Sequence, residues 1–290
     1  MSYLMKGKSW QDHHHKLKYP VYVEPKVDEI RLHVLIEPNG AVRYLSYAGK
    51  PLHNLGYWDE GMRQLARLLG TRNLDMGVEV NGNFNDSYRW VRSSRGVPAG
   101  LLHSQVKFYL FDAPEWQGVY SDRSRALSGA VAHFRDTVCL LPLERHEPAL
   151  AGTEAAVTAA YERLRDSGYE GAMVKTLDHL YQPGKRIDGW LKLKPEETAD
   201  GVIVDVLRAT SIQGEPLDRV GSALVRVPLD SEGEGWAVAC PAGIPHELGR
   251  AMWANPVKYI GKWVEFKYME RDRQGGFRHP SFIRFREPKA

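Results

Sequence analysis

The spacing of apolar residues changes at "KPEETADG", residues 194–201. Before this stretch, segments with helical spacing are interspersed with segments in which apolar and polar residues alternate. After it come short apolar segments separated by glycine, proline and polar residues, with no helical pattern longer than about three turns. Short strands between turn residues are typical of a small barrel or sandwich. We therefore predict two domains, residues 1–196 with helices and strands and residues 197–290 built from strands.

The first domain is expected to combine strands with flanking helices. Strand-like segments occupy residues 21–37, 41–47, 76–84, 105–112, 171–176 and 188–194, with "EPNG" at 37–40 as a hairpin turn. Helical spacing covers residues 59–70, 122–136 and 153–167, and Gly70 and Gly168 are suitable helix ends. Residues 1–20 are expected to form an irregular arm.

Composition narrows the class of protein. With 43% hydrophobic and 26% charged residues, the chain has the composition of a soluble globular protein. No apolar run approaches the ~20 residues of a membrane span, and residues 1–20 lack the apolar centre of a signal peptide. Cys139 and Cys240 match neither a disulfide framework nor a zinc pattern. These features predict a cytoplasmic protein that is not secreted and does not contact a membrane.

The C-terminal end of the chain is basic. Residues 258–290 hold nine Lys or Arg and four Asp or Glu, a net charge of +5, whereas the whole chain carries +3. A basic end on a near-neutral body indicates a polyanionic partner such as a nucleic acid. A solvated charged hairpin would have the same composition, so charge alone leaves both interpretations open.

A single lysine in "VEPKVDEIRLHV", residues 23–34, is a candidate nucleophile. Strand alternation puts Lys26 between Glu24 and Asp28 on one face, just before an apolar run. A lysine with an ordinary pKa is almost fully protonated at pH 7, so a lysine nucleophile needs burial or nearby cations to favour its neutral form. Taken alone, the pattern fits a surface strand edge better than a reactive site.

Further lysines supply the cations that such a nucleophile needs. In "WLKLK" (190–194), alternation puts Lys192 and Lys194 on one face with Trp190, and "EGAMVK" (170–175) ends in Lys175. These ammonium groups would repel a protonated lysine nearby and would attract phosphates. Several lysines around one lysine therefore suggest a phosphate-bearing substrate.

Two acids and one aromatic segment complete the candidate site. Glu79 and Glu170 lie on strand-like segments beside apolar residues, where a carboxylate needs a cation, a hydroxyl or a metal as partner. Taken alone, each acid fits a structural ion pair better; with a phosphate substrate, the two suggest Mg²⁺, which keeps several waters and few protein ligands. In "FYLFD" (108–112), alternation separates Phe108 from Phe111, and one aromatic ring is available to stack on a base unless both lie in the core.

In order and spacing, these stretches resemble the covalent nucleotidyltransferases, and among them the ATP-dependent DNA ligases, especially the short two-domain ligases of bacteriophages. "KVDEIR" (26–31) is similar to the family's KxDGxR, "EGAMVK" to its EGxMVK and "WLKLK" to its WxKxK. "YMERDRQGGFRHPSFIRFR" (268–286) is similar to the end of the phage ligases' second domain. The resemblance covers most of the chain, from about residue 19 to residue 289.

The resemblance implies a fold and an activity. The fold would be α+β: an ATP-grasp-like adenylyltransferase (nucleotidyltransferase) domain with antiparallel sheets and flanking helices, followed by a small OB-fold β-barrel that binds DNA. The enzyme would use ATP and Mg²⁺, with Mn²⁺ as a substitute, to seal 3′-OH/5′-phosphate nicks in double-stranded DNA. It would act as a monomer, in the host cytoplasm if a phage encodes it.

The resemblance also implies residue roles. Lys26 would take AMP from ATP as a phosphoramidate. Around the nucleotide would lie Glu24 at the adenine amino group, Phe108 on the ring, Arg31 and Glu79 at the ribose, Lys192 and Lys194 at the α-phosphate, and Lys175. The metal at the reacting phosphate would be held by Glu170, Asp28 and Glu79. The segment with Arg278, Arg284, Arg286 and Lys289 would close over ATP, and Arg278, Arg286 and Lys289 would hold the leaving pyrophosphate from outside.

The chain departs from the family pattern in three places. Glu29 stands where KxDGxR has glycine, which adds a charge near the phosphates. Tyr47 follows Ser46 where the family has arginine, which removes a cation that would hold sugar or a DNA phosphate. Gly77-Val78-Glu79 stands where the family has Asp-Gly-Glu and keeps only the last acid.

Three alternatives remain at this point. An mRNA capping guanylyltransferase or an RNA ligase would share the lysine chemistry, although "RHPSFIRFR" (278–286) favours a DNA ligase. A non-catalytic nucleic-acid-binding protein would use Lys26, Lys192 and Lys194 as mere phosphate contacts. An NAD-dependent ligase is disfavoured, because only about 25 residues precede Lys26, too few for the extra domain with which that family binds the nicotinamide half.

Overall fold

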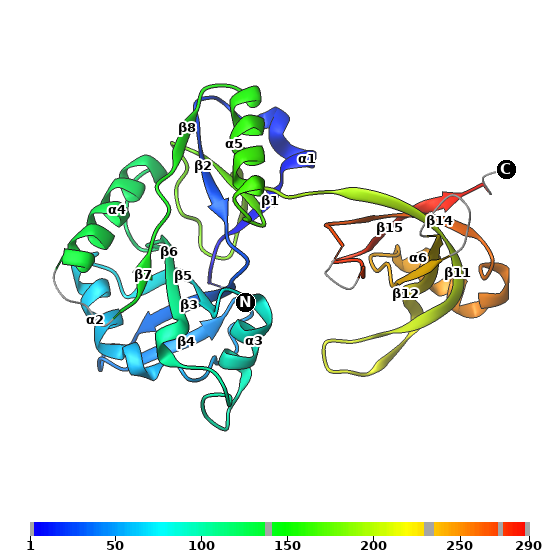
Figure 1. The fold of residues 1–290 in the computed structure, drawn as a ribbon, viewed down its shortest axis with the longest axis horizontal. Helices are drawn as coiled ribbons and strands as arrows, with labels where there is room; N and C mark the ends of the chain where they lie inside the picture. The colour runs from blue at the N-terminus through cyan, green and yellow to red at the C-terminus, as the bar shows by residue number, and fades with distance from the viewer. Residues whose placement is uncertain (1–2, 137–140, 229–234, 272–274, 288–290) are drawn as a thin grey trace. The chain divides into compact units, whose positions relative to one another are not determined.

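The structure, a computed structural model, describes residues 3–136, 141–228, 235–271 and 275–287. The chain divides into two compact units, Met1–Lys194 and Pro195–Ala290. This division lies two residues before the boundary predicted from the change in sequence pattern. Each unit is described by itself below (Figure 1).

Two five-stranded sheets form the first unit. One sheet has the order β4-β3-β5-β6-β7 and contains β3 (Ile30–Ile36), β4 (Val42–Ser46), β5 (Asn73–Val80), β6 (Val106–Asp112) and β7 (Leu143–Glu144). The other has the order β1-β10-β9-β2-β8 and contains β1 (Lys6–Ser9), β2 (Val21–Lys26), β8 (Ala149–Ala151), β9 (Gly171–Thr176) and β10 (Arg186–Leu193). Most neighbouring strands are antiparallel, whereas β1–β10 and β6–β7 are parallel.

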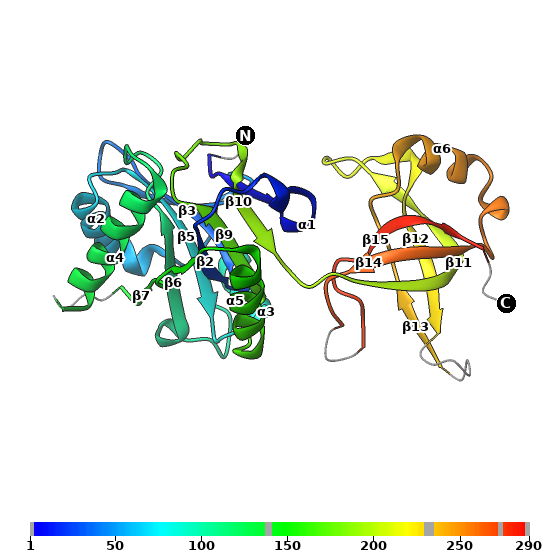
Figure 2. The same ribbon diagram turned by 90° about the horizontal axis from the view of Figure 1, so that it is seen from above.

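Helices cover the outer faces of these sheets. Helices α2 (Asp59–Leu68), α3 (Phe84–Arg92) and α4 (Tyr120–Asp136) pack on the sheet that contains β3, and α5 (Glu154–Asp166) packs on β2, β8 and β9 (Figures 1 and 2). The apolar stripe of α2 faces the sheet and buries Met62 and Leu65 completely. Thr153 caps α5 by accepting a hydrogen bond from the Ala156 amide, and Gly168 ends the helix region with φ +87°, a conformation that favours glycine. The inner strand faces thus remain available for a site between the sheets.

The strands and helices of the first unit differ from the sequence prediction in several places, and the short strands β7 and β8 were not predicted. The segment 21–37 is two strands in different sheets, because the chain leaves β2 after Lys26 and enters β3 at Ile30. Residues 84–92 form helix α3, whose N-cap Asn83 accepts a hydrogen bond from the Asp86 amide. The irregular arm expected at residues 1–20 instead contains β1, α1 (Trp10–His13) and a 3-10 helix at His14–Lys16. Two other 3-10 turns lie at Gly56–Trp58 and His103–Gln105.

The second unit is a curved sheet with the order β13-β12-β11-β14-β15. Its strands are β11 (Glu197–Thr210), β12 (Pro216–Pro228), β13 (Trp236–Ala239), β14 (Trp263–Tyr268) and β15 (Ser281–Arg286). After β13, Ala242 forms an antiparallel bridge to Ser222 of β12 and a parallel bridge to Ser281 of β15. These bridges join the two ends of the sheet and give the strand order of an OB-type barrel, without a continuous ladder at the seam. Helix α6 (His246–Ala254) packs on β12, and a 3-10 turn follows at Pro256–Lys258.

Two strands of this unit are longer than the short strands that the sequence suggested. β11 has 14 residues and β12 has 13, and their pairing shifts register at three places. Register shifts bend and twist a strand pair, so one long strand can contribute to both sides of a curved sheet. The α+β fold with antiparallel sheets, flanking helices and an OB-type second unit is otherwise the predicted one. No helix of the described chain is long and apolar enough to cross a bilayer.

Candidate active site

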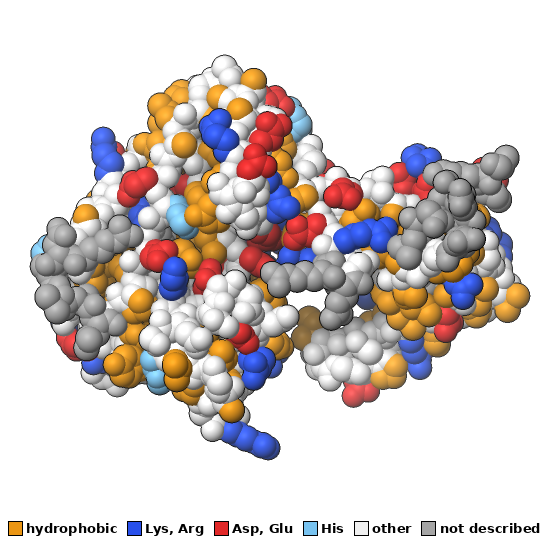
Figure 3. All heavy atoms as spheres, in the orientation of Figure 1, with side chains coloured by type: hydrophobic (Ala, Val, Ile, Leu, Met, Phe, Trp, Pro, Cys, Tyr) orange, Lys and Arg blue, Asp and Glu red, His pale blue; other side chains and the backbone are white. Residues whose placement is uncertain are grey.

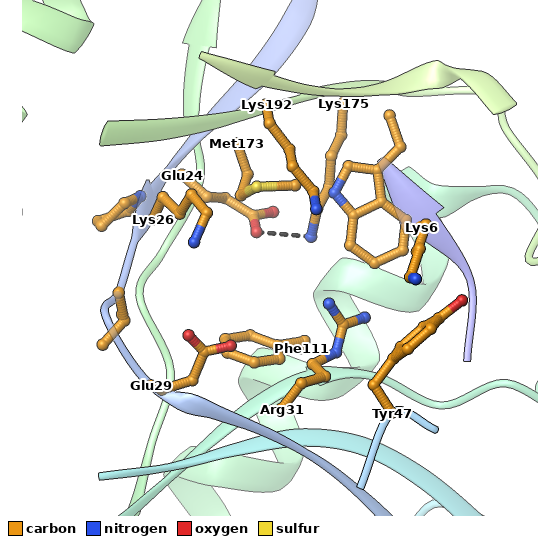
Figure 4. Close-up of a pocket in the computed structure, with 13 residues that line it drawn as sticks. Lys6, Glu24, Lys26, Glu29, Arg31, Tyr47, Phe111, Met173, Lys175 and Lys192 are labelled. Atoms are coloured by element: carbon orange, nitrogen blue, oxygen red, sulfur yellow. Dashed lines mark hydrogen bonds and ion pairs between the residues drawn. The ribbon is translucent and has the colours of Figure 1, made fainter. Parts of the chain in front are cut away.

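A cavity of about 230 Å³ lies between the two sheets of the first unit. Its lining comes from β1, β2, β3, β6, β9 and β10 and from the segments after β2 and β4. Glu29, Phe111 and Arg31 lie along one wall and face Lys26, Met173 and Lys192 across the cavity (Figure 4). The remaining lining residues are Lys6, Glu24, Pro25, Val27, Tyr47, Lys175 and Trp190. Such a mixture of aromatic, apolar and cationic groups suits a ligand with a flat ring and an anionic end.

Lys26 is the last residue of β2, where its side chain reaches the cavity wall. Its ammonium group is hydrogen-bonded to one carboxylate oxygen of Glu170, and Lys194 binds the other oxygen. The Glu170 side chain is only 5% exposed. Burial alone would raise the pKa of Glu170, but Lys26 and Lys194 outweigh it and hold the pKa below its ordinary value. Glu170 therefore stays ionised and fixes both lysines beside the cavity.

A buried polar network closes one end of the cavity. The Lys175 ammonium lies 2.6 Å from a Glu24 oxygen and 2.8 Å from the Tyr120 hydroxyl, which itself donates to Glu24. Arg145 donates to the Ser124 hydroxyl at 2.8 Å on the far side of this network. Burial lowers the pKa of Lys175, although Glu24 opposes that shift. Glu24 and Lys175 thus present an acceptor and a donor side by side to the edge of a bound ring.

The opposite wall is stiffened by Arg31. Its Nε and one terminal nitrogen donate to the two oxygens of Asp75 at 2.5 and 2.6 Å, and the Tyr181 hydroxyl donates to Asp75 at 2.8 Å. The guanidinium lies 5.3 Å from the ring centroids of both Phe111 and Trp190. Bidentate pairing with a completely buried acid fixes the plane of the guanidinium against the cavity. No pattern in the sequence singled out Asp75 or Tyr181.

Of the two phenylalanines of β6, Phe111 lines the cavity, so the predicted role of Phe108 needs correction. Phe108 is completely buried in the hydrophobic core, where its ring meets that of Trp58 edge to face at 5.0 Å. Alternation along β6 does separate Phe108 from Phe111, but the face with Phe108 is the one that the helices cover. Phe111 instead lines the cavity opposite Met173 (Figure 4).

Two predicted metal ligands lie away from the cavity lining. Glu79 accepts a hydrogen bond at 3.1 Å from the Tyr109 hydroxyl, and Asp28 lies in the segment between β2 and β3. Neither lines the cavity, and among the described residues no group of three His, Cys, Asp or Glu side chains is arranged to hold a metal ion. Both carboxylate oxygens of Glu170, the third predicted metal ligand, are hydrogen-bonded to lysines, one to Lys26 and the other to Lys194.

Lys192 and Glu29 have unusual electrostatics. Burial, together with Lys26 and Arg31, lowers the pKa of Lys192 to about 8. Burial raises the pKa of Glu29 to about 7, against the opposing effect of Lys26 and Arg31. Both groups are therefore only weakly held in their charged forms, and a charged ligand can shift either one.

At Tyr47, where the ligase pattern has arginine, the structure places a cation from another strand. The ammonium of Lys6 lies 3.4 Å from the centroid of the Tyr47 ring, and both residues line the cavity. A cation over an aromatic face is favourable, so Tyr47 positions a cation that comes from β1. This lysine lies in the segment predicted to be an irregular arm, which is why the sequence pattern missed it.

The basic C-terminal segment lies in the second unit, where its arginines are paired. Arg284 and Arg286 both reach Glu265 of β14, at 2.7 and 3.0 Å, and Arg278 lies 2.6 Å from Glu270. Lys289 lies outside the described residues. Of the two cysteines, Cys240 is exposed and unbonded, and Cys139 lies outside the described residues. On the visible face, basic side chains lie among acidic and apolar ones (Figure 3).

Relatives of known function match part of the chain. A DNA ligase of Escherichia phage T7 is 30% identical over 151 residues, which covers 43% of this chain and 40% of the relative. A DNA ligase of Enterobacteria phage T3 is 34% identical over 133 residues, which covers 45% of this chain and 37% of the relative. The chain thus spans about two fifths of the length of these relatives.

Solved structures match nearly the whole chain in fold. A Lig E DNA ligase aligns over 99% of this chain and 100% of its own, with a TM-score of 0.73 and 19% identity. The ligase of bacteriophage T7, solved with ATP, aligns over 98% of each chain with a TM-score of 0.51 and 21% identity. At these identities the likeness concerns the fold.

A family model gives the most specific match. The model of the "ATP dependent DNA ligase domain" matches residues 101–194, which include Phe111, the Glu170–Lys175 stretch and the Lys192–Lys194 stretch of the site. The resemblance predicted from the six sequence stretches is therefore confirmed, and residues 101–194 of the chain match the ATP-dependent DNA ligase domain family.

Proposed function

We propose that this protein is an ATP-dependent DNA ligase that seals 3′-OH/5′-phosphate nicks in duplex DNA through AMP bound to Lys26. One observation carries the proposal: Lys26 reaches the wall of a base-sized cavity, and its ammonium is fixed by a carboxylate that also binds Lys194. Lysines that only bind phosphate would not need a neighbouring cavity lined by aromatic and apolar side chains and by Glu24 and Lys175. The family match and the phage relatives support the same activity.

The side chains suggest how ATP binds. The adenine ring would lie between Phe111 and Met173, with its polar edge at Glu24 and Lys175. The triphosphate would then extend toward Lys26, Lys192 and Lys194, because these cations gather beside the cavity. Glu170 would hold the Lys26 nitrogen in place for an in-line approach to the α-phosphorus.

The chemistry is three displacements at phosphorus. In the first, the neutral Lys26 amine forms a P–N bond with the α-phosphorus while the bond to the bridging oxygen breaks, pyrophosphate leaves and the amine gives up one proton to solvent. In the second, an oxygen of the DNA 5′-phosphate forms a bond to the AMP phosphorus, the P–N bond breaks, and the leaving nitrogen takes up a proton. In the third, the 3′-hydroxyl attacks the 5′-phosphorus, AMP leaves, and the hydroxyl proton is lost to solvent.

Cations carry much of the stabilisation that these steps need. Negative charge moves onto the leaving group in each displacement, and fixed cations aimed at that charge lower the barrier. Lys192 and Lys194 supply this from β10 and the residue after it. A magnesium ion bound near Glu170 would add Lewis-acid stabilisation when present. DNA binding would come from both the first unit and the OB-type unit, in a monomeric cytoplasmic enzyme.

The proposal is tested with ATP labelled at the α-phosphate. We expect the wild-type protein to keep an acid-labile, base-resistant label on a denaturing gel and to seal a nicked duplex. Lys26→Arg should keep the fold and lose the label, because a guanidinium is not neutral at working pH. The matched control is Lys107→Arg, an exposed lysine that pairs with Glu144 and should label normally.

Other outcomes separate the alternatives. A Lys26→Arg protein that is still labelled would refute the assigned nucleophile. Labelling by GTP rather than ATP would indicate a capping guanylyltransferase, and sealing only of RNA ends would indicate an RNA ligase. A wild-type protein that binds DNA but is not labelled by any nucleotide would be a non-catalytic binding protein.

A further inference from the structure

One position on β5 lacks a side chain. Asp75, Gly77 and Glu79 share one face of β5, because alternate residues of a strand point the same way. Asp75 binds Arg31 and Glu79 binds the Tyr109 hydroxyl, whereas Gly77 pairs directly with Arg31 across the strands. The face of β5 between Asp75 and Glu79, behind the cavity lining, is therefore open to a side chain from elsewhere.

Glu29 fills this opening. A β-carbon built on Gly77 would lie 2.3 Å from Glu29 Cγ and 2.9 Å from two ring carbons of Phe111. Side chains do not approach this closely, so position 77 can carry a side chain only if Glu29 moves. The absence of a side chain at Gly77 thus leaves the space that the Glu29 side chain occupies, and Glu29 reaches this space from the segment after Lys26.

The neighbours of Glu29 limit what part of a nucleotide can lie against it. Phe111, beside Glu29, is the platform for the base, and Lys26 and Lys192 across the cavity are the groups for phosphates (Figure 4). A carboxylate repels phosphate oxygens and has nothing specific to offer a ring face. The ribose connects base to phosphate, and its two hydroxyls are donors that a carboxylate accepts from strongly.

We propose that Glu29 binds the ribose hydroxyls of ATP and makes this enzyme select ribonucleotides, a role that the sequence pattern would give to Glu79. Arg31, held by Asp75 on the same wall, would donate to the same sugar. This inference rests on the proposed function, because it concerns the nucleotide that labels Lys26. It also explains why two departures from the family pattern, at Glu29 and Gly77, occur together in one chain.

The experiment compares self-adenylation by ATP and by 2′,3′-dideoxy-ATP, which lacks both ribose hydroxyls. We expect the wild-type protein to prefer ATP, measured as the ratio of the two kcat/KM values. Glu29→Gln should reduce that ratio by about tenfold or more, since a hydrogen bond to a charged group is lost while the dideoxy substrate is little affected. The matched control is Glu60→Gln, an exposed acid of α2, which should keep the wild-type ratio.

Moving the carboxylate from position 29 to position 77 by mutation gives a second, independent test. Gly77→Glu alone should impair adenylation, because the new side chain meets Glu29. Adding Glu29→Gly to Gly77→Glu should restore activity and the preference for ATP, since the double variant carries the acid on β5 instead. Restored activity alone would follow from relief of the clash, whereas a restored preference for ATP requires a carboxylate at this place.

The outcomes distinguish this inference from the proposed function. If the wild-type protein is not adenylated by ATP at all, the proposed function itself fails. If it is adenylated and Glu29→Gln leaves the ATP preference unchanged, only the role of Glu29 is wrong. A loss of preference in Glu79→Gln instead of Glu29→Gln would return the ribose contact to Glu79.

Discussion

At the scale of single residues, the charged form of Lys192 suits phosphate binding but lowers the stability of the free protein. It is largely buried near Lys26 and Arg31, and its pKa is lowered to about 8. Between pH 8 and its unfolded value of 10.5, the folded chain binds fewer protons than the unfolded chain, so this group's contribution to stability increases as pH rises. Below pH 8 the full cost of holding the charged lysine remains. A phosphate ligand would offset that cost.

Replacing Lys192 with methionine should therefore stabilise the free protein while abolishing adenylation. At pH 7 we expect the unfolding free energy of the variant to exceed that of wild type by up to about 3 kcal/mol, which raises its melting temperature. The difference should shrink toward pH 10. Thermal unfolding of both proteins at the two pH values measures this. A Lys192→Met protein that is less stable than wild type at pH 7 would contradict the sign of this argument.

The residues of the cavity could be predicted where chemistry demands a residue type, and not where packing decides. Lys26, Glu24, Arg31, Lys175 and Lys192 were all predicted and all line one cavity. Phe108 was predicted in place of Phe111, because alternation defines two faces of β6 without saying which face the helices cover. That choice depends on helices distant in the sequence.

At the scale of elements, local patterns located most helices and strands but not their breaks. The apolar stripe and terminal glycine of α2 were sufficient to predict it, as were the helical spacing and Gly168 for α5. The separation of β2 from β3 coincides with a break in alternation, because the charged residues Asp28 and Glu29 are adjacent, but the sequence prediction ran one strand through it. Strand β1 was missed because its short segment only becomes a strand by pairing with β10. Such pairing is a long-range property.

Strand β15 and the residues around it carry a prediction about the first reaction step. We expect that removing the charges of Arg278, Arg286 and Lys289 by substitution with glutamine lowers self-adenylation severely, because pyrophosphate must be held as it leaves in line with Lys26. Sealing of a nick that is supplied already adenylated should survive in part. The measurement is the rate of each step assayed separately.

The matched control for this prediction is Arg208→Gln in the same unit, which removes an exposed arginine paired with Asp218. It should leave both steps at wild-type rates. If the substitutions around β15 leave labelling by ATP unchanged and weaken binding to nicked DNA, this segment is a DNA clamp and has no part in the first step.

At the scale of the whole molecule, the order of six short motifs was more informative than any one of them. Each stretch had an ordinary structural explanation, yet together they predicted an α+β unit followed by an OB-type unit. The family match lies in the first unit, and the strand order of the second unit agrees with the prediction. Strand lengths and the near-closure through Ala242 were outside what spacing can predict, because they depend on register shifts and long-range bridges. The relation between Glu29 and Gly77 could not be predicted either, because it is seen only in the three-dimensional contact between the two residues.

The central claim is that Lys26 carries AMP. Wild-type protein incubated with ATP and a divalent metal, then digested and mapped by mass spectrometry, tests it most directly. We predict an AMP adduct on the peptide that contains Lys26, and its loss when pyrophosphate is added. An adduct on Lys6 or Lys192 instead, or sealing of nicks by a protein that never carries AMP, would contradict the claim.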